Sequence, residues 1–275
     1  MRVRGKCPVC DSELNPKWQL QVLHRHNVQY FECGNCGLLC TEQPYWLDEA
    51  YKSAINIEDT GIIQRSIQFS RITSSIILVL HNIRARFLDY AGGYGFFVRM
   101  MRDLGFDFYW YDKYAQNLIA RGFEFVPSES NGQEFELVTT FEVLEHIVEP
   151  REFFSELSQY SDAILLSTVL KPDDVSTDWW YLGPEHGQHV VIHTRRSLEI
   201  LAEKLGFKCV SYRNLHYFSK KKVPSRWLFA STIRLSRLIS ALGSFCTKSL
   251  AESDFHKLTK LKSSYLQNLQ NSADN

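Results

Sequence analysis

Two pairs of cysteines have the spacing of a metal site. Cys7 and Cys10 form one C-x-x-C turn, and Cys33 and Cys36 form a second. Four thiolates close a tetrahedral Zn²⁺ shell and leave no open position, so the pattern predicts a structural zinc ion rather than a catalytic one. Redox chemistry between the paired thiols is the alternative.

A glycine-rich turn follows an apolar segment at 88–95, with the sequence LDYAGGYG. Gly92, Gly93 and Gly95 permit positive φ and close approach of a ligand, and a helix N-terminus directly after the turn offers free amide donors. Asp112 ends the next apolar segment about 20 residues later, where an acid binds a ribose hydroxyl in βαβ nucleotide sites. The spacing predicts a site for a nucleotide-containing cofactor.

A loop at 178–190 is dense in titratable and aromatic residues, among them Glu185, His186 and His189. Histidine changes its protonation near neutral pH and can take a proton from a hydroxyl or a carbon acid. His146, beside Glu145, is a further candidate. The alternative for each of these side chains is a structural role, such as a helix cap or a bond to a backbone carbonyl.

The block at 135–147 contains the sequence EVLEH and makes a family resemblance specific. Together with LDYAGGYG and Asp112, it resembles class I S-adenosylmethionine-dependent methyltransferases, whose fourth strand ends at the active site in a similar motif. The resemblance covers residues 62–219. It implies that S-adenosylmethionine is bound by Asp89, Ala91, Gly92, Gly93, Gly95, Asp112, Phe141 and Glu142. The family has glycine where this chain has Ala91, and we expect that alanine to keep a negative φ.

An N-terminal zinc ribbon on such a core is similar to the arrangement in sugar C-methyltransferases. Their Glu-His pair, in which one member abstracts a proton, resembles Glu185 with His186. The resemblance implies a histidine base, first His186, and an acceptor that is a sugar or another glycan or natural-product precursor. Two alternatives remain: a non-catalytic protein of this fold that binds partners, and a nicotinamide-dependent oxidoreductase with the same βαβ unit.

The elements that position these residues alternate between strands and helices. Apolar segments predict strands at 87–90, 106–111, 123–126, 137–141, 163–168, 208–212 and 215–219, with helices between them. This order predicts an α/β fold, a Rossmann-like seven-stranded, mostly parallel sheet with helices on both faces and an antiparallel last strand. Ligands of such sheets bind beyond the carboxyl ends of the strands.

Four segments are expected along the chain: a zinc ribbon at 1–43, a connector and helix at 44–84, the methyltransferase domain at 85–219 and a basic amphipathic helical tail at 220–275. The aromatic residues at 44–51 either cover the acceptor or bury area at a domain junction. The tail either lies on an anionic membrane surface, caps the domain or pairs two subunits.

Composition is that of a globular protein, with 275 residues of which 44% are hydrophobic. Lys plus Arg and Asp plus Glu both total 31, so the net charge gives no reason to expect a nucleic acid partner. The first residues carry no apolar run, which predicts neither a secretory signal nor a membrane anchor there. We expect a cytoplasmic protein, peripheral to the inner membrane face if the tail binds lipid.

Overall fold

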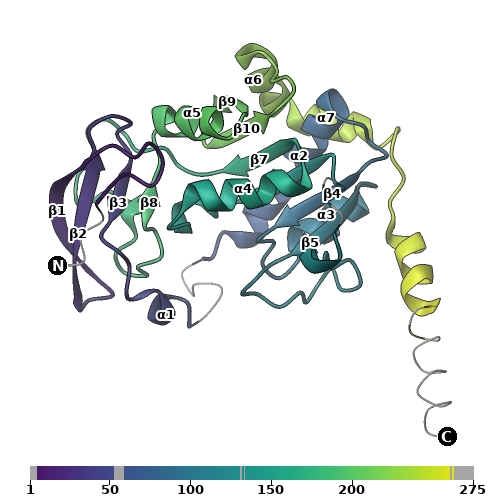
Figure 1. Ribbon diagram of the computed structural model, residues 1–275. Coiled ribbons are helices and arrows are strands. Elements are labelled where there is room, and N and C mark those ends of the chain that lie inside the picture. The colour runs from purple at the N-terminus through teal and green to yellow at the C-terminus, as the bar shows by residue number, and fades with distance from the viewer. Residues whose placement is uncertain (1–4, 53–58, 131, 133, 261, 263–275) are drawn as a thin grey trace, which may run out of the picture.

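The computed structural model describes residues 5–52, 59–130, 132, 134–260 and 262 (Figure 1). The first residues of the predicted ribbon, part of the predicted connector and the end of the predicted tail lie outside these residues. Two sheets organise the described chain: a four-stranded sheet near the N-terminus and a six-stranded sheet in the core.

The core sheet has the strand order β5-β4-β6-β7-β10-β9. Its strands are β4 (Arg86–Tyr90), β5 (Asp107–Tyr111), β6 (Leu137–Phe141), β7 (Ala163–Ser167), β9 (Lys208–Tyr212) and β10 (Leu215–Ser219). β4 pairs in parallel with β5 and β6, and β6 pairs in parallel with β7. β10 is antiparallel to β7 and β9, so the mostly parallel sheet and its antiparallel last strand are as predicted.

Helices cover both faces of the core sheet, as predicted (Figure 1). They include α2 (Ile62–Leu80), α3 (Phe96–Asp103), α4 (Pro150–Tyr160) and α5 (Arg195–Lys204). Successive strand residues point to opposite faces. Leu88 therefore belongs to a buried cluster that includes Phe154 of α4, whereas its neighbour Phe87 belongs to a cluster that includes Met101 of α3. These two buried clusters pack on the sheet in which β4, β5 and β6 run parallel, so the carboxyl ends of the three strands lie at the same edge.

The seventh strand, expected at 123–126, does not form. This segment makes one β-bridge to β5, between Glu124 and Trp110. The backbone of Trp110 exchanges two hydrogen bonds with Phe123 and Phe125, at 2.8 and 2.7 Å. Pro127 then has no N–H to extend the ladder and begins the 3₁₀ turn η1 (Pro127–Glu129), so pairing at the sheet edge stops there. The sheet has six strands for this reason.

The N-terminal ribbon contains β1 (Leu14–Val22), β2 (His26–Cys33) and β3 (Leu39–Thr41). Its fourth strand comes from much later in the chain, because β8 (Val191–Ile192) pairs antiparallel with β3. Figure 1 shows the ribbon at the left of the core, with β8 beside β3. The loop that precedes β8 is therefore attached directly to the ribbon. A short helix, α1 (Leu47–Ala50), follows the ribbon.

The tail contains two short helices after β10, α6 (Arg226–Arg234) and α7 (Ser236–Gly243), which meet at Leu235. Both contact α2. Residues 251–260 are also helical, and Asp254 there forms a buried ion pair with Arg102 of α3. Among the described residues, none of the helices has the length and apolar character needed to cross a membrane.

Candidate active site and cysteine cluster

The glycine-rich turn lies between β4 and α3 and uses a left-handed backbone at three positions: φ is 62° at Ala91, 55° at Gly93 and 88° at Gly95. The expectation of a negative φ at Ala91 is therefore wrong. A Cβ costs roughly 1–2 kcal/mol in this region. A Cβ on Gly92 would lie 2.7 Å from Asp89 Oδ2 and 2.8 Å from Trp110 Cδ1.

Asp89 lies buried beneath this turn. Thr139 donates a hydrogen bond to its Oδ1 at 2.7 Å. Burial raises the pKa of Asp89 to about 7, although the hydrogen bond from Thr139 favours the charged form. This carboxyl supports the turn from below.

Asp112, at the end of β5, binds backbone amides from two loops. Its Oδ2 accepts from the Gly93 amide at 2.9 Å, and its Oδ1 accepts from Tyr114 and Ala115 at 2.7 and 2.8 Å. A Cβ built on Gly93 would meet no atom within 4 Å, so the turn opens to free space at this point. The two predicted parts of the cofactor site, the turn and the acid, therefore lie together.

Phe141 and Glu142 end β6 at the same edge. The Phe141 ring stacks on Phe69 of α2 at 4.3 Å. Glu142 has a φ of 54°, its amide donates to Ser167 Oγ at 2.8 Å, and the Ser167 hydroxyl donates to the Glu142 carboxylate. Burial, and then the charge of Glu145, raises the pKa of Glu142. Strain at a non-glycine residue is frequent in functional sites.

Three of the predicted catalytic residues form a contiguous group, which we call the histidine cluster: His146, His186 and His189. The His189 ring lies 4.9 Å from the His146 ring and 4.8 Å from the His186 ring, between ring centroids. His146 comes from the turn after β6, and the other two come from the loop before β8. Sequence positions about forty residues apart thus meet at the edge where β6 ends.

Hydrogen bonds indicate the protonated nitrogen of two of the three rings, those of His189 and His186. The Nδ1 of His189 lies 2.6 Å from the Tyr181 carbonyl, and the Nδ1 of His146 lies 3.1 Å from the Gln188 carbonyl. A carbonyl only accepts, so the Nδ1 of His189 carries the proton and its Nε2 carries a lone pair. The Nδ1 of His146 also lies 2.9 Å from the Tyr51 hydroxyl, which can either donate to it or accept from it. His186 has the opposite tautomer. Its Nδ1 accepts a hydrogen bond from the Gln188 amide at 3.1 Å, so its proton is on Nε2.

Burial keeps His146 and His189 neutral. It lowers the pKa of His146 to about 4. Burial also lowers the pKa of His189 well below its ordinary value, and the neighbouring His146 lowers it further. Both rings are therefore uncharged at physiological pH, and the lone pair of His189 is at Nε2.

Glu145 and Glu185 have different surroundings. Glu145 is 1% exposed, and its Oε2 has no hydrogen-bond partner among the described residues. Carboxylate or imidazole atoms of Glu145, His146 and His189 lie within 4.8 Å of one another. Glu185 is exposed. Burial raises the pKa of Tyr30 in the ribbon, and the negative charge of Glu185 raises it further. Of the predicted Glu-His pair, only His186 joins the histidine cluster.

The ribbon and the connector hold the loop that carries His186 and His189. The Leu23 amide donates to the Pro184 carbonyl at 2.8 Å, and the indole of Trp46 donates to the Gly187 carbonyl at 2.7 Å. The Tyr51 hydroxyl lies 2.9 Å from His146 Nδ1. Tyr51 and Gln188 were not predicted as site residues. The aromatic connector both buries area at the junction and reaches the histidine cluster.

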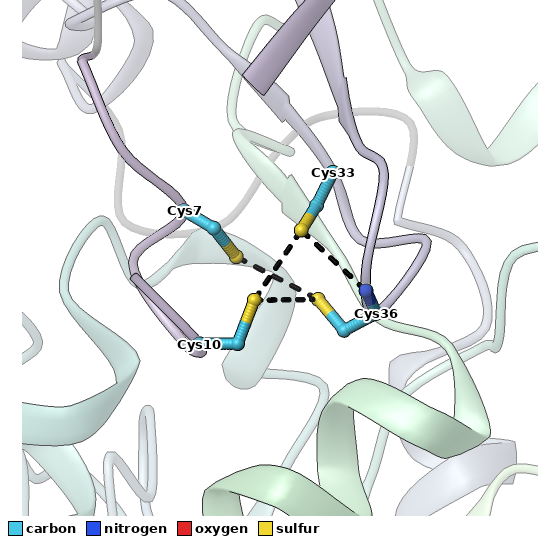
Figure 2. Close-up of side chains that lie close together, drawn as sticks. All are labelled: Cys7, Cys10, Cys33 and Cys36. Atoms are coloured by element: carbon cyan, nitrogen blue, oxygen red, sulfur yellow. Dashed lines mark hydrogen bonds between the residues drawn. The ribbon is translucent and has the colours of Figure 1, made fainter. Parts of the chain in front are cut away.

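The four ribbon cysteines converge (Figure 2). Cys10 Sγ lies 3.3 Å from Cys33 Sγ and 3.6 Å from Cys36 Sγ, and Cys7 Sγ lies 3.6 Å from Cys36 Sγ. These separations exceed the disulfide bond length of about 2 Å. Zn–S bonds of about 2.3 Å place tetrahedral sulfurs about 3.8 Å apart, so the group fits zinc after small movements.

Comparison with known proteins decides the family. A family model described as a methyltransferase domain matches residues 65–212, more than half of the chain. The chain belongs to this methyltransferase family. It is an S-adenosylmethionine-dependent methyltransferase, and the nicotinamide-dependent alternative is set aside. The curated proteins compared with this methyltransferase include no match.

Several solved structures are similar to this methyltransferase at low identity. The magnesium protoporphyrin IX methyltransferase of Synechocystis PCC 6803 with bound SAH is 16% identical over 64% of this chain and 93% of that chain, with a TM-score of 0.44. A possible histamine N-methyltransferase from Thermotoga maritima is 10% identical over 58% and 92%, with a TM-score of 0.43. The bifunctional kinase-methyltransferase WbdD is 16% identical over 67% and 43%, with a TM-score of 0.40. At these values the similarity says nothing about the acceptor.

The geometry of this methyltransferase fits its cofactor. Gly93 borders open space, Gly92 has no room for a side chain, and the Asp112 carboxylate lies beside them, a combination that suits a ribose. The amides at the start of α3 and the strained Glu142 border the same edge.

Proposed function

We propose that this methyltransferase acts on a small-molecule acceptor, a sugar or another glycan or natural-product precursor, with His189 as the general base. The observation that carries the proposal is the hydrogen bond between His189 Nδ1 and the Tyr181 carbonyl. Because this bond fixes the proton on Nδ1, Nε2 is available to take a proton from the acceptor. His186, which the sequence places first, instead uses its Nδ1 lone pair to bind the Gln188 amide.

The cofactor would lie against the glycine-rich turn, with Asp112 on its ribose and Glu142 near its other end. Bound S-adenosylmethionine supplies an electrophilic methyl group on a positively charged sulfur. The protein's own part is to orient the acceptor, to exclude water and to remove one proton. In this proposal His189 removes that proton from the acceptor.

Aromatic residues beside the cluster support a sugar acceptor. Trp180 is 73% exposed, and its ring lies 5.2 Å from Tyr181, whose ring lies 4.6 Å from His189. An exposed tryptophan presents a flat apolar face, which suits the C–H face of a sugar ring.

We also propose that Cys7, Cys10, Cys33 and Cys36 hold a structural zinc ion. The four thiols converge, and the Cys36 amide lies 3.5 Å from the Cys33 sulfur toward which it points. Thr194 donates to the Cys36 carbonyl at 2.5 Å, directly before α5. Zinc would therefore hold together the ribbon strands to which β8 and the loop at 178–190 are attached.

Methyl transfer from labelled S-adenosylmethionine to a panel of sugars and nucleotide sugars tests the proposal. With an acceptor in hand, His189→Ala should lower kcat by about 100-fold or more, the usual contribution of a general base, and leave cofactor affinity unchanged. His186→Ala is the matched variant and should lower kcat far less, because the Nδ1 of His186 accepts a hydrogen bond within its own loop. Full turnover by His189→Ala, or equal loss of kcat in both variants, would contradict the assignment of the base.

A further inference from the structure

A positively charged segment follows β10. Residues 220–250, which we call the basic segment, contain seven Lys or Arg residues and no Asp or Glu. The remaining residues have 24 Lys or Arg against 31 Asp or Glu, so the neutral chain divides into a positive segment and a negative remainder. The basic segment includes α6 and α7, which Figure 1 shows at the top of the view, apart from the ribbon.

Helix α7 turns its small and polar residues inward. Ser74 of α2 donates to Ser240 Oγ at 2.9 Å, and Ser75 donates to the Ser236 carbonyl at 3.0 Å. A Cβ on Gly243 would lie 2.3 Å from Leu78, so α7 packs closely against α2 at that point. The inward face is therefore occupied by serine and glycine.

The outward face of α7 carries its large apolar residues. Leu235, Leu238 and Leu242 are 52, 57 and 56% exposed, and Phe245 directly after the helix is 88% exposed. Their spacing of three or four residues places them on one side. Surface helices of globular proteins normally bury such a stripe. In α7 the apolar face points to solvent and the polar face packs on α2.

Helix α6 adds an exposed tryptophan and unpaired charge at its start. Trp227 is 78% exposed, whereas Phe229 is buried. Arg226 and, in α7, Arg237 are exposed, and neither has an acidic partner among the described residues. Exposed tryptophan and leucine flanked by arginine are the features of helices that lie in a membrane interface.

We propose that the basic segment binds an anionic membrane surface, with the leucine stripe of α7 and Trp227 entering the interface and the arginines facing lipid phosphates. Charge complementarity favours this occupant over a second copy of the chain, because two basic segments would repel each other when they meet. This inference is independent of the acceptor and of the base proposed above.

Sedimentation with vesicles tests this proposal on the full chain. We expect binding to vesicles that contain phosphatidylglycerol, weak binding to pure phosphatidylcholine, and loss of binding at high salt. Leu238→Glu with Leu242→Glu should weaken binding at least about 100-fold, since two apolar contacts are replaced by charges that anionic lipid repels. Arg226→Gln with Arg237→Gln should weaken it about 25-fold. Phe255→Glu is the matched control, because Phe255 is 66% exposed outside the basic segment, and its binding should equal that of the wild type.

Cofactor affinity and thermal unfolding, measured on each variant, show that the fold is intact. The absence of binding to any vesicle would overturn the proposal. It would also be overturned if the wild type forms a dimer that Leu238→Glu dissociates, or if Phe255→Glu loses vesicle binding as fully as the leucine variants do.

Discussion

Replacing His216 with glutamine removes a proton-binding site that burial suppresses in the folded protein. His216 lies in β10 and is 0% exposed. Its Nδ1 lies 2.7 Å from Ser211 Oγ, and its Nε2 lies 3.1 Å from the Thr168 carbonyl, to which it donates. Glutamine offers one donor and one acceptor to the same partners but does not titrate in this range.

The magnitude follows from the two pKa values of His216. Burial lowers its pKa in the folded protein to about 4, from 6.5 in a model peptide. The unfolded chain therefore takes up a proton first as the pH falls, and stability is lost from near the unfolded pKa down to the folded one, by about 1.4 kcal/mol per pH unit. At roughly pH 5 the loss relative to pH 8 is about 2 kcal/mol.

Urea unfolding at both pH values measures this difference. The free energy of unfolding of His216→Gln should fall by about 2 kcal/mol less than that of the wild type between pH 8 and roughly pH 5. Titrating groups that do not interact with His216 contribute equally to both proteins and cancel, including Asp89, whose raised pKa acts in the opposite direction. If both proteins lose the same stability, the burial argument for His216, and by extension for His146 and His189, is refuted.

Three further changes have expected results. Ala91→Gly should raise the free energy of unfolding by about 1 kcal/mol, because glycine relieves the positive φ; an unchanged or lower value speaks against that backbone conformation. Asp254→Asn should destabilise the protein by about 3 kcal/mol in urea, since it removes a buried partner of Arg102, and a loss below about 0.5 kcal/mol would show that Asp107 suffices. Cys36→Ser should abolish the one zinc ion per chain expected by elemental analysis, and retention of a full equivalent would disprove the four-cysteine site.

The sequence predicts those parts of the structure that rest on local pattern. The turn at Gly92 and Gly93 and the acid at Asp112 follow from the order strand, turn, helix, strand, and parallel pairing of β4 with β5 then brings them together. The segment at 123–126 is apolar enough to predict a strand. Its pairing stops because Pro127 has no N–H to donate at the edge of the sheet, and hydrophobic periodicity does not reveal this.

The histidine cluster is predictable in membership but not in chemistry. His186 and His189 stand out in the sequence, yet the choice of base depends on which ring nitrogen meets a backbone carbonyl. The contact between Tyr51 and His146 joins positions 95 residues apart and leaves no local signal. The reversed orientation of α7 is equally invisible, because an amphipathic pattern does not say which face meets the core.

Calorimetric titration with S-adenosylmethionine tests the central claim most directly, namely that the turn after β4 and the acid after β5 form its binding site. We expect one mole bound per mole of wild-type protein. Gly93→Val should abolish binding, because its side chain would enter the open space above the turn, and Asp112→Ala should weaken binding about tenfold or more by removing the carboxylate. Wild-type protein that does not bind the compound, or both variants binding it as tightly as the wild type, would contradict the account.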